Sequence, residues 1–455
     1  MDIVATAAYR STMRRAWVAT LLLAALAACG GGGGEATTDA APADAPAPVD
    51  AAAGPTAADL FDETQVRTLE LTVAASDWDW LNANPLLEQY VPGALTWNGV
   101  TVARLGVRYK GSVGSLRLCF DAGGNRRCPK LSMKLDFDEY VGGQRFLGLE
   151  HLNLHAMMRD PSAMKERLVY GLFRAAGVAA PRAAHARVRV NGADLGLFVL
   201  VEEIDREFVQ DHFRAVDGSG AGNLYKEVWP VYATAAPYAA ALETNTTTPD
   251  VARVLRFAAA LAAATPTTFR ATATTWLDLP NLVSFLAVDR LVDNWDGFVG
   301  WYCASANGGA CTNHNYYWYE EAGRDRLWLL PWDVDNTMQV PSPIRTNFGM
   351  PDWNASPTDC ARRAIFLGYF GRPPACDHLT ALMARVLWTD YQARTAELLA
   401  GPAAPGVLEA EIDAMAAQLA PEVATDRFGP TPSDWQAAVA KLRRDLTTLR
   451  ARVAP

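Results

Sequence analysis

The sequence has few of the residues and motifs from which common catalytic and nucleic-acid sites are built. Only 6 of its 455 residues are histidines, and the one pair spaced by four, His151 and His155, lies in a stretch that alternates like a strand. Gly-x-Ser-x-Gly, His-Glu-x-x-His and Cys-x-x-Cys are absent, so serine hydrolases, zinc proteases and zinc ribbons are not indicated. The formal net charge is −9 at pH 7, and no basic run alternates with aromatic residues. A nucleic acid is therefore not an expected partner.

The first 58 residues lack the pattern of a folded segment. Three arginines precede an apolar run from Ala16 to Ala28, which is short for a membrane span and has the layout of an export signal. The run ends in Leu26-Ala27-Ala28-Cys29, which resembles the bacterial lipobox with its lipidated cysteine; an ordinary secretory signal with an incidental cysteine is the alternative. Residues 30–58 are rich in Gly, Ala and Pro and predict a flexible tether. We expect residues 1–29 to be a lipoprotein signal and the protein to lie in the cell envelope, held to a membrane by lipid alone, periplasmic or surface-exposed.

The other six cysteines fall into three locally spaced pairs. They are Cys119, Cys128, Cys303, Cys311, Cys360 and Cys376. This spacing favours three small disulfide-closed loops in an oxidising compartment, with each cysteine bound to its neighbour as the most economical connectivity. A zinc site is the competing interpretation, and His314 is the one histidine close to any of these cysteines.

Beyond the tether, the pattern changes along the chain from strands to helices. Between residues 66 and 203 short apolar stretches alternate with polar residues, most strictly over Pro129–Phe137, and Asn191-Gly192 links the strands of a predicted hairpin. Helical spacing dominates the rest and covers 251–264, 279–293, 378–399, 407–419 and 432–453. A β-rich part followed by a helix-rich part predicts an α+β fold with two lobes, residues 59–204 and 205–455.

Two aspartates near tryptophans, with an asparagine between them, form the strongest candidate for a site. Asp296 follows a predicted helix, Asn315 begins a predicted hairpin, and Asp333 follows the second strand of that hairpin. If Tyr319 pairs with Arg326, Asn315 and Asp333 emerge at the same end of the hairpin. Protein kinases use this order: an Asp that receives the hydroxyl proton, an Asn that binds metal and an Asp that binds Mg²⁺.

Neighbouring acids leave alternatives open. Asp335 either shares a metal with Asp333 or is itself the ligand. Asp296 between Asn and Gly is also compatible with a simple turn. We interpret Asp289 and Asp293 as surface or helix-end charges paired with Arg290 and assign them no role.

Two charged residues upstream fit the same order. Lys134 lies on the polar face of a predicted strand, where a cation could contact phosphates, and Glu166 lies on the helix predicted between Asp160 and Gly177, where it could hold Lys134. A solvated strand residue and an exposed helix face are the alternatives for these two positions.

Six stretches of the sequence carry a family pattern. They are Val107-Arg108-Tyr109-Lys110-Gly111-Ser112, Pro129-Lys130-Leu131-Ser132-Met133-Lys134, Asn191-Gly192 with Gly196-Leu197-Phe198-Val199-Leu200-Val201-Glu202, Asn294-Trp295-Asp296, Asn315-Tyr316-Tyr317 and Pro331-Trp332-Asp333-Val334-Asp335. Together and in order they resemble the CotH-type spore-coat protein kinases, which have an atypical kinase fold. The resemblance implies binding of ATP with Mg²⁺ or Mn²⁺ and transfer of the γ-phosphoryl group to hydroxyls of a protein, here an exported or surface protein.

The resemblance also implies roles for single residues. Asp296 would be the catalytic base, and Asp333 would bind the metal with help from Asn315. Lys134 would contact the phosphates and Glu166 would orient it. The candidate cofactor-binding residues are Lys134, Glu166, Lys110 and Glu202.

One departure from the pattern keeps other functions open. The interval between Asp296 and Asn315 is long and holds Cys303 and Cys311, and such an insertion either forms a rim that faces the substrate or blocks the site. Because ATP is scarce outside the cytoplasm, a catalytically silent kinase fold that serves binding or adhesion is the main alternative. A carbohydrate-associated envelope protein is a third hypothesis.

Overall fold

The structure is a computed structural model that describes residues 54–111, 116–343, 349–355, 359–365 and 368–454. The predicted signal peptide with Cys29, the tether up to residue 53, and Ser112 lie outside these residues. Helix α2 (Ala57–Leu60) begins before the predicted end of the tether. The contacts of Pro55–Pro455 form one unit, so the division into lobes at residue 204 remains a prediction.

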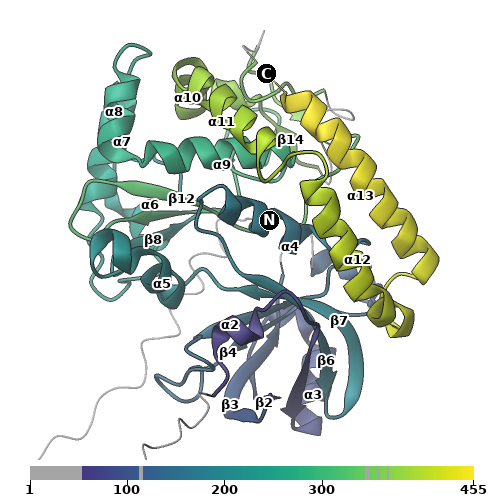
Figure 1. The fold of residues 1–455 in the computed structure, drawn as a ribbon. Coiled ribbons are helices and arrows are strands. Elements are labelled where there is room, and N and C mark those ends of the chain that lie inside the picture. Colours follow the sequence, from purple (N-terminus) through teal and green to yellow (C-terminus); the bar gives the residue numbers. More distant parts are fainter. Residues whose placement is uncertain (1–53, 112–115, 344–348, 356–358, 366–367, 455) are drawn as a thin grey trace, which may run out of the picture. The chain divides into compact units, whose positions relative to one another are not determined.

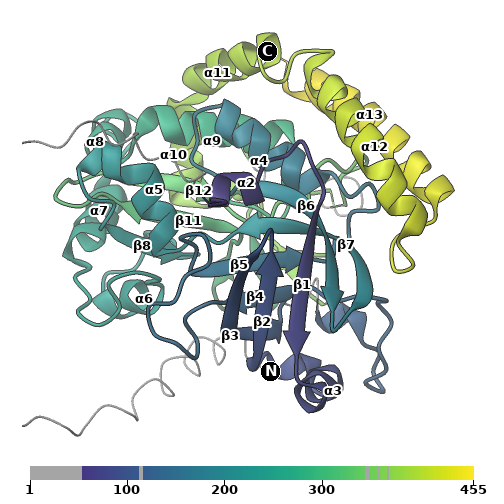
Figure 2. The same ribbon diagram turned by 60° about the horizontal axis from the view of Figure 1, so that its bottom comes forward.

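Seven strands from the first half of the chain close into a barrel (Figures 1 and 2). Neighbours run antiparallel, except that β1 and β6 are parallel and close the barrel. In barrel order the strands are β1 (Arg67–Val73), β2 (Val91–Trp97), β3 (Val100–Tyr109), β4 (Met133–Asp136), β5 (His151–His155), β7 (Ala193–Glu202) and β6 (Ala183–Val190). The short helices of this region are α2, α3 (Ala75–Ala83), η1 (Pro85–Leu87) and η2 (Arg117–Cys119).

Alternation along β4 and β5 separates an apolar barrel interior from a polar outer face. The inward side chains of β4 and β5 are Met133, Leu135, Leu152 and Leu154, all buried in the barrel core. Between them Lys134 of β4 pairs in register with Asn153 of β5, and both point outward because successive side chains of a strand alternate. Strand β4 is shorter than the predicted stretch Pro129–Phe137, but the predicted alternation is confirmed.

The predicted hairpin at Asn191-Gly192 is confirmed by β6 and β7. Both turn residues have positive φ, 51° for Asn191 and 78° for Gly192, as a two-residue turn of the primed type requires. The Asn191 side chain also bonds to both backbone groups of Val73 on β1 (2.9 and 2.8 Å). The turn thereby fixes the parallel closure of the barrel.

Helices dominate the rest of the chain and share a second apolar core with two smaller sheets. They are α4 (Lys165–Ala175), α5 (Arg206–Asp217), α6 (Ala235–Ala240), α7 (Ala252–Ala263), α8 (Phe269–Trp276), α9 (Leu279–Leu291), η4 (Pro374–Cys376), α10 (His378–Val386), α11 (Trp388–Ala400), α12 (Val407–Thr425) and α13 (Pro432–Val453). Helix α9 is buried from Asn281 to Leu291, which positions the loop that follows it. The helix predicted over 378–399 is divided at Leu387 into α10 and α11, and α4 begins later than Pro161 because the Asp160 carboxylate caps the amides of Met164 and Lys165 (both 2.8 Å).

A three-stranded sheet carries the predicted second hairpin. Its strands are β8 (Asn223–Lys226), β11 (Tyr316–Glu320) and β12 (Leu327–Pro331), in the order β12-β11-β8. Tyr319 pairs with Trp328 rather than with Arg326, so the predicted register is wrong by two residues. A shift of two preserves the faces of both strands, and it brings Asp333 nearer to Asn315, whose backbone oxygen accepts from Trp332 N (3.2 Å).

All three predicted disulfides are present: Cys119–Cys128, Cys303–Cys311 and Cys360–Cys376. Two of them brace a small sheet in the order β10-β9-β14-β13. Its strands are β9 (Tyr302–Cys303), β10 (Cys311–Thr312), β13 (Arg363–Ala364) and β14 (Phe370–Gly371). Among the described helices none is long and apolar enough to cross a membrane.

Candidate functional site

Asp296 lies in the loop after α9 and is held by two asparagines from other parts of the chain. Asn315 Nδ2 donates to the backbone oxygen of Asp296 (2.9 Å) and to its Oδ2 (3.3 Å), and Asn336 Nδ2 also donates to Oδ2 (3.1 Å). Burial raises the pKa of Asp296 to about 6, although His314 and a hydrogen bond from Tyr302 oppose the shift. A carboxylate with this pKa is ionised at neutral pH and is more basic than an ordinary aspartate, which suits it to accept a proton.

The other aspartates of this region are engaged in buried ion pairs. Asp289 Oδ2 accepts from Arg290 Nη2 (2.6 Å), and Asp293 Oδ2 lies 2.8 Å from Arg452 Nη1 on α13. Both carboxylates are buried and lie at the C-terminal end of α9, so of the two predicted alternatives the surface charge is wrong and the helix-end charge is confirmed. The predicted partner Arg290 is confirmed for Asp289.

Asn315 and Asp333 both have left-handed backbone conformations at the end of the β11–β12 hairpin. Their φ angles are 64° and 46°, values that are uncommon outside glycine and favoured there by Asn and Asp. The backbone N–H of Asn315 also donates to Glu227 Oε1 (2.9 Å). Both left-handed turns lie at the same end of the hairpin, where the sequence predicted that Asn315 and Asp333 emerge together.

The acids after β12 fit a divalent cation. Asp335 Oδ1 is buried and has no hydrogen-bond partner within the described part of the chain. Burial, together with the charges of Asp333 and Glu166, raises the pKa of Asp335 well above its usual range. Within the described residues no three His, Cys, Asp or Glu side chains form a metal cluster. Mg²⁺ needs only one or two carboxylates because it retains waters and binds phosphates.

A continuous series of polar contacts runs along the outer face of the barrel. In order it joins Lys134, Glu203, Asn153, Lys110, His155 and Glu166. Lys134 Nζ lies 3.2 Å from Glu203 Oε1, and Glu203 Oε2 accepts from Asn153 Nδ2 (2.7 Å). Asn153 Oδ1 accepts from Lys110 Nζ (2.7 Å). Asn153 is fully buried. Its side-chain amide connects Lys110 to Glu203, and Glu203 in turn contacts Lys134.

His155 completes the series between Lys110 and Glu166. Its Nε2 lies 2.9 Å from Lys110 Nζ, and its Nδ1 lies 2.6 Å from Glu166 Oε1. Burial lowers the pKa of His155 to about 3, so the ring is neutral. Since Nε2 accepts from the lysine, the network assigns the ring proton to Nδ1, which donates to Glu166.

Two expected contacts therefore differ from the prediction. Lys134 pairs with Glu203 instead of Glu166, and Glu166 is connected to it only through the intervening side chains. Glu202 is buried and bonded to Arg182 (3.0 Å from Nε to Oε2). The alternation of β7 directs Glu202 and Glu203 to opposite sides, so Glu203 is the carboxylate beside Lys134.

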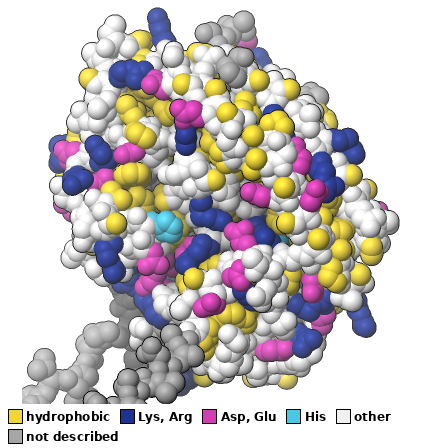
Figure 3. All heavy atoms as spheres, in the orientation of Figure 1, with side chains coloured by type: hydrophobic (Ala, Val, Ile, Leu, Met, Phe, Trp, Pro, Cys, Tyr) yellow, Lys and Arg dark blue, Asp and Glu magenta, His cyan; other side chains and the backbone are white. Residues whose placement is uncertain are grey.

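Three lysines, Lys110, Lys134 and Lys226, lie near the carboxylate of Glu203, and two of them also lie over the indole of Trp332. Lys110 Nζ and Lys226 Nζ lie 5.2 and 5.8 Å from the Trp332 ring centroid. Burial lowers the pKa of Lys110 to about 8. Lys134 and Lys110 outweigh burial and hold the pKa of Glu203 well below its usual range. Charged side chains of both signs gather across the middle of the face shown in Figure 3. The arrangement offers cations for phosphates opposite acids for a metal.

Sequence reasoning missed Glu203, Asn153, His155 and Lys226. Strand parity could have identified the first three, since each lies on the same outer face as Lys134. Lys226 ends β8, which reaches the site only because β8 pairs with β11. A pairing across about ninety residues of chain leaves no local signal in the sequence.

The His155 link can be tested through stability. In His155→Leu, Lys110 and Glu166 lose a buried partner, and the free energy of unfolding should fall by about 2 kcal/mol. In His155→Gln the amide can accept from Lys110 and donate to Glu166, so most of this loss should be recovered. Urea unfolding of both variants measures the difference; equal stability of Leu and Gln variants would argue against the link.

His151, on the same strand, predicts a pH dependence of stability. Its Nδ1 lies 2.9 Å from Asp205 Oδ2 and its Nε2 lies 3.5 Å from Asp136 Oδ2. Burial and the charge of Lys134 lower the pKa of His151. The carboxylates of Asp136, Asp205 and Glu203 raise it by more, to about 9. Because the folded pKa exceeds the unfolded value of 6.5, this stabilisation is complete below pH 6.5 and is lost as the pH rises to about 9. We expect unfolding free energy to fall on the order of 2 kcal/mol over that window, with the fall absent in His151→Asn.

Comparison with known proteins agrees with the residue pattern. The family model described as CotH kinase protein matches residues 107–447, most of the chain. The inner spore coat protein H of Bacillus subtilis (strain 168) is 24% identical over 199 residues, 42% of this chain. The match spans about half the length of that relative, 51%.

A solved structure is also similar at a low level. The Helicobacter pylori proinflammatory kinase CtkA aligns over 71% of this chain and 94% of its own with 6% identity and a TM-score of 0.22, too low to support a common fold. The family model confirms the resemblance seen in the sequence. The chain belongs to the CotH kinase protein family.

Proposed function

We propose that the protein is a kinase that transfers the γ-phosphoryl group of ATP to a hydroxyl group of an exported or surface protein. The observation that carries this proposal is the convergence of Asp296, Asn315 and Asn336 beside the acids Asp333 and Asp335. A base near neutrality, an amide and two further acids are the parts that phosphoryl transfer requires. In this interpretation the barrel and the helical part act as the two lobes of a kinase.

The lysines would bind the phosphates. Lys110, Lys134 and Lys226 form a cluster around Glu203 and Trp332, so an incoming polyphosphate would replace one carboxylate as their counter-charge. Because Lys110 is already held by Asn153 and His155 and Lys134 by Glu203, these two side chains need little rearrangement when nucleotide binds.

Asp333 and Asp335, assisted by the Asn315 amide oxygen, would hold Mg²⁺ or Mn²⁺. The ion would neutralise charge on the phosphates and orient them. The chain's own contribution is to supply oxygen ligands at the end of the β11–β12 hairpin, where Asn315 and Asp333 adopt left-handed backbone conformations.

Asp296 would accept the proton of the substrate hydroxyl group. The substrate oxygen forms a bond to the γ-phosphorus, the bond from that phosphorus to the β-γ bridging oxygen breaks, and ADP leaves. The hydroxyl proton passes to the Asp296 carboxylate, which its raised pKa suits to receive it. Asn315 and Asn336 keep that carboxylate in place.

We also propose that the reaction takes place outside the cytoplasm, at a membrane surface. Three disulfides are compatible with an oxidising, extracellular compartment. Lipidation at Cys29 would hold the protein to a membrane surface, with its substrate among exported proteins.

The test is incubation of the purified protein with Mg²⁺, γ-labelled ATP and a protein acceptor, together with a nucleotide-binding measurement. Label should reach Ser, Thr or Tyr of the acceptor or of the kinase itself. Nucleotide binding without transfer at any pH would favour the binding or adhesion function. Absence of both at millimolar ATP would remove the kinase assignment.

A further inference from the structure

The disulfide-closed insertion after Asp296 returns to the loop that carries this residue. We propose that Tyr302 is a positioning residue for Asp296: its hydroxyl group fixes the direction of the carboxylate, and the Cys303–Cys311 disulfide holds Tyr302 in place. The inference rests on the proposed kinase function and adds a support for the base that the kinase order of residues does not contain.

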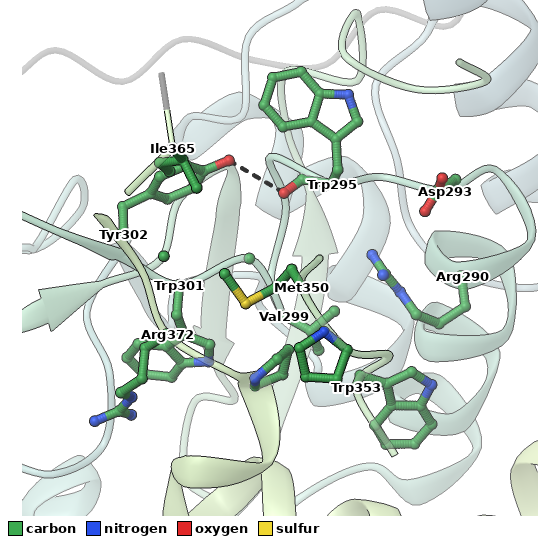
Figure 4. Close-up of a pocket in the computed structure, with 14 residues that line it drawn as sticks. Arg290, Asp293, Trp295, Val299, Trp301, Tyr302, Met350, Trp353, Ile365 and Arg372 are labelled. Carbon is green, nitrogen blue, oxygen red and sulfur yellow. Dashed lines mark hydrogen bonds between the residues drawn. The ribbon is translucent and has the colours of Figure 1, made fainter. Parts of the chain in front are cut away.

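The hydroxyl group of Tyr302 lies against two consecutive residues of the loop after α9. It donates to the backbone oxygen of Trp295 (3.2 Å), the contact drawn as a dashed line in Figure 4, and it is also within hydrogen-bonding reach of the Asp296 side chain. Tyr302 is 7% exposed, so water competes little for either contact. One side chain thereby restrains both the backbone that leads into Asp296 and the carboxylate itself.

Tyr302 adds a direction from which Asp296 is held. Asn315 at the start of β11 and Asn336 beyond β12 both donate to Oδ2 of Asp296 (3.3 and 3.1 Å), whereas Tyr302 belongs to β9. Contacts from several elements limit the rotation of the carboxyl group, and a base must point a lone pair at the hydroxyl proton within a narrow range of directions. A misplacement of about 1 Å can cost on the order of a hundredfold in rate.

The small sheet determines where Tyr302 lies. In the order β10-β9-β14-β13, β9 is an inner strand, and Tyr302 pairs with Thr312 on one side and with Gly371 on the other. The next pair along β9 and β10 is Cys303 with Cys311, which the disulfide also joins. Strands this short are at best marginally stable by themselves. The disulfide therefore contributes the constraint that keeps Tyr302 beside the loop.

Gly300 makes room for the Tyr302 contact. Its backbone N–H donates to Gly297 O (2.9 Å), which turns the chain between Asp296 and Tyr302. A Cβ at position 300 would lie 2.5 Å from the Trp295 oxygen, the same oxygen that accepts from the tyrosine. Glycine therefore allows the turn and the hydrogen bond together.

The chain beyond the disulfide is tied to the same loop. Asn313 Nδ2 donates to Phe298 O (2.6 Å), and Asn315 Nδ2 donates to Asp296 O (2.9 Å). Tyr302, Asn313 and Asn315 are all buried. The sequence left a rim and a block open for this insertion, and these buried contacts indicate a support for the loop instead.

The first variant removes the hydroxyl group and keeps the ring. In Tyr302→Phe, kcat for label transfer should fall roughly tenfold to a hundredfold because Asp296 is less well directed, while KM for ATP and for the acceptor protein stays within about twofold of the native values. A native kcat in this variant, or a rise in KM alone, would overturn the role of Tyr302 and leave the kinase function intact.

Tyr238→Phe is the matched control. The Tyr238 hydroxyl group lies on α6 in the buried core and donates to the backbone oxygen of Tyr232 at the same distance of 3.2 Å. Its loss removes the same kind of hydrogen bond away from Asp296. Tyr238→Phe should therefore lose a similar amount of stability and keep the native kcat, and a fall in kcat equal to that of Tyr302→Phe would overturn the positioning role.

Removal of the disulfide shows whether it acts through Tyr302. Cys303→Ala with Cys311→Ala should lower kcat in the native background by a factor similar to that of Tyr302→Phe. In the Tyr302→Phe background the same change should cost less than about twofold, because coupled groups are not additive. Cys119→Ala with Cys128→Ala opens a disulfide outside the small sheet and should leave kcat unchanged. Equal factors in both backgrounds would overturn the coupling between the disulfide and the tyrosine.

Amide hydrogen exchange measures the restraint without catalysis. The backbone N–H groups of residues 294–300 should exchange roughly fivefold faster in Tyr302→Phe than in the native protein, as expected for the loss of one hydrogen bond, and at the native rate in Tyr238→Phe. Faster exchange in a protein that transfers no label would support the contact and reject the kinase function. Unchanged exchange would overturn the positioning role, whether or not label is transferred.

Discussion

Replacement of Asp296 by Asn should lower the rate of phosphoryl transfer about 10²- to 10⁴-fold, the usual contribution of a general base. Asn keeps the size and most hydrogen bonds of the side chain, so the contacts with Asn315 and Asn336 can persist on its oxygen. It removes the charge that receives the hydroxyl proton. Nucleotide affinity and thermal stability should change little, because Asp296 does not belong to the lysine cluster.

Asp293 provides the matched control, three residues earlier in the same stretch. Asp293→Asn breaks the buried ion pair with Arg452 of α13 and should cost about 3 kcal/mol of unfolding free energy. Asn tolerates the left-handed φ of 48° at this position, so the backbone is not additionally strained. Transfer per folded molecule should remain near that of the native protein. If Asp296→Asn and Asp293→Asn lose phosphoryl transfer equally, the loss reflects damage to the fold and Asp296 is not shown to be a base.

Local patterns accounted for much of the fold. The disulfides were predictable because each closes a short loop, and the β6–β7 hairpin because Asn191-Gly192 selects its turn. The division at Leu387 was missed because helical spacing continues on both sides of it. The register of β11 and β12 was wrong because the turn lies one residue further along the chain than predicted: Glu320 pairs with Leu327, whereas Tyr319 was expected opposite Arg326. Every pairing is thereby shifted by two residues, and a two-residue slip leaves the apolar pattern unchanged.

Some residues of the candidate site were predictable from the sequence, but their contacts were not. Asp296 and Asn315 meet as expected. The partner of Lys134 could not be chosen from composition, since Glu166, Glu202 and Glu203 are all carboxylates in suitable elements. Burial and strand parity decided it in favour of Glu203. Closure of the barrel, which brings β4, β5 and β7 side by side, is a long-range property that no short stretch records.

The second large effect should follow replacement of Asp333 by Asn. Its backbone φ of 46° lies in the left-handed region, where Asn is tolerated and Ala is not favoured. Asn therefore separates loss of the charge from loss of the turn. If Asp333 is the principal metal ligand, the loss of several kcal/mol of charge stabilisation corresponds to roughly a 10³-fold fall in transfer. The Mg²⁺ concentration needed for half-maximal nucleotide binding should rise as well.

Asp335→Asn decides between the two roles left open for the second acid. If Asp335 only assists, its variant should lose about tenfold in metal affinity, as supporting groups do, and excess Mn²⁺ should restore transfer. If Asp335 is itself the principal metal ligand, Asp335→Asn should lose more phosphoryl transfer than Asp333→Asn, and excess Mn²⁺ should not restore that transfer. Among the described residues Asp335 Oδ1 has no hydrogen-bond partner. Because the Asn side chain carries no charge that needs a counter-ion, Asp335→Asn should stabilise the metal-free protein. If the Asp333→Asn and Asp335→Asn variants both keep the metal dependence of the native protein, this end of the hairpin is excluded as the cation site.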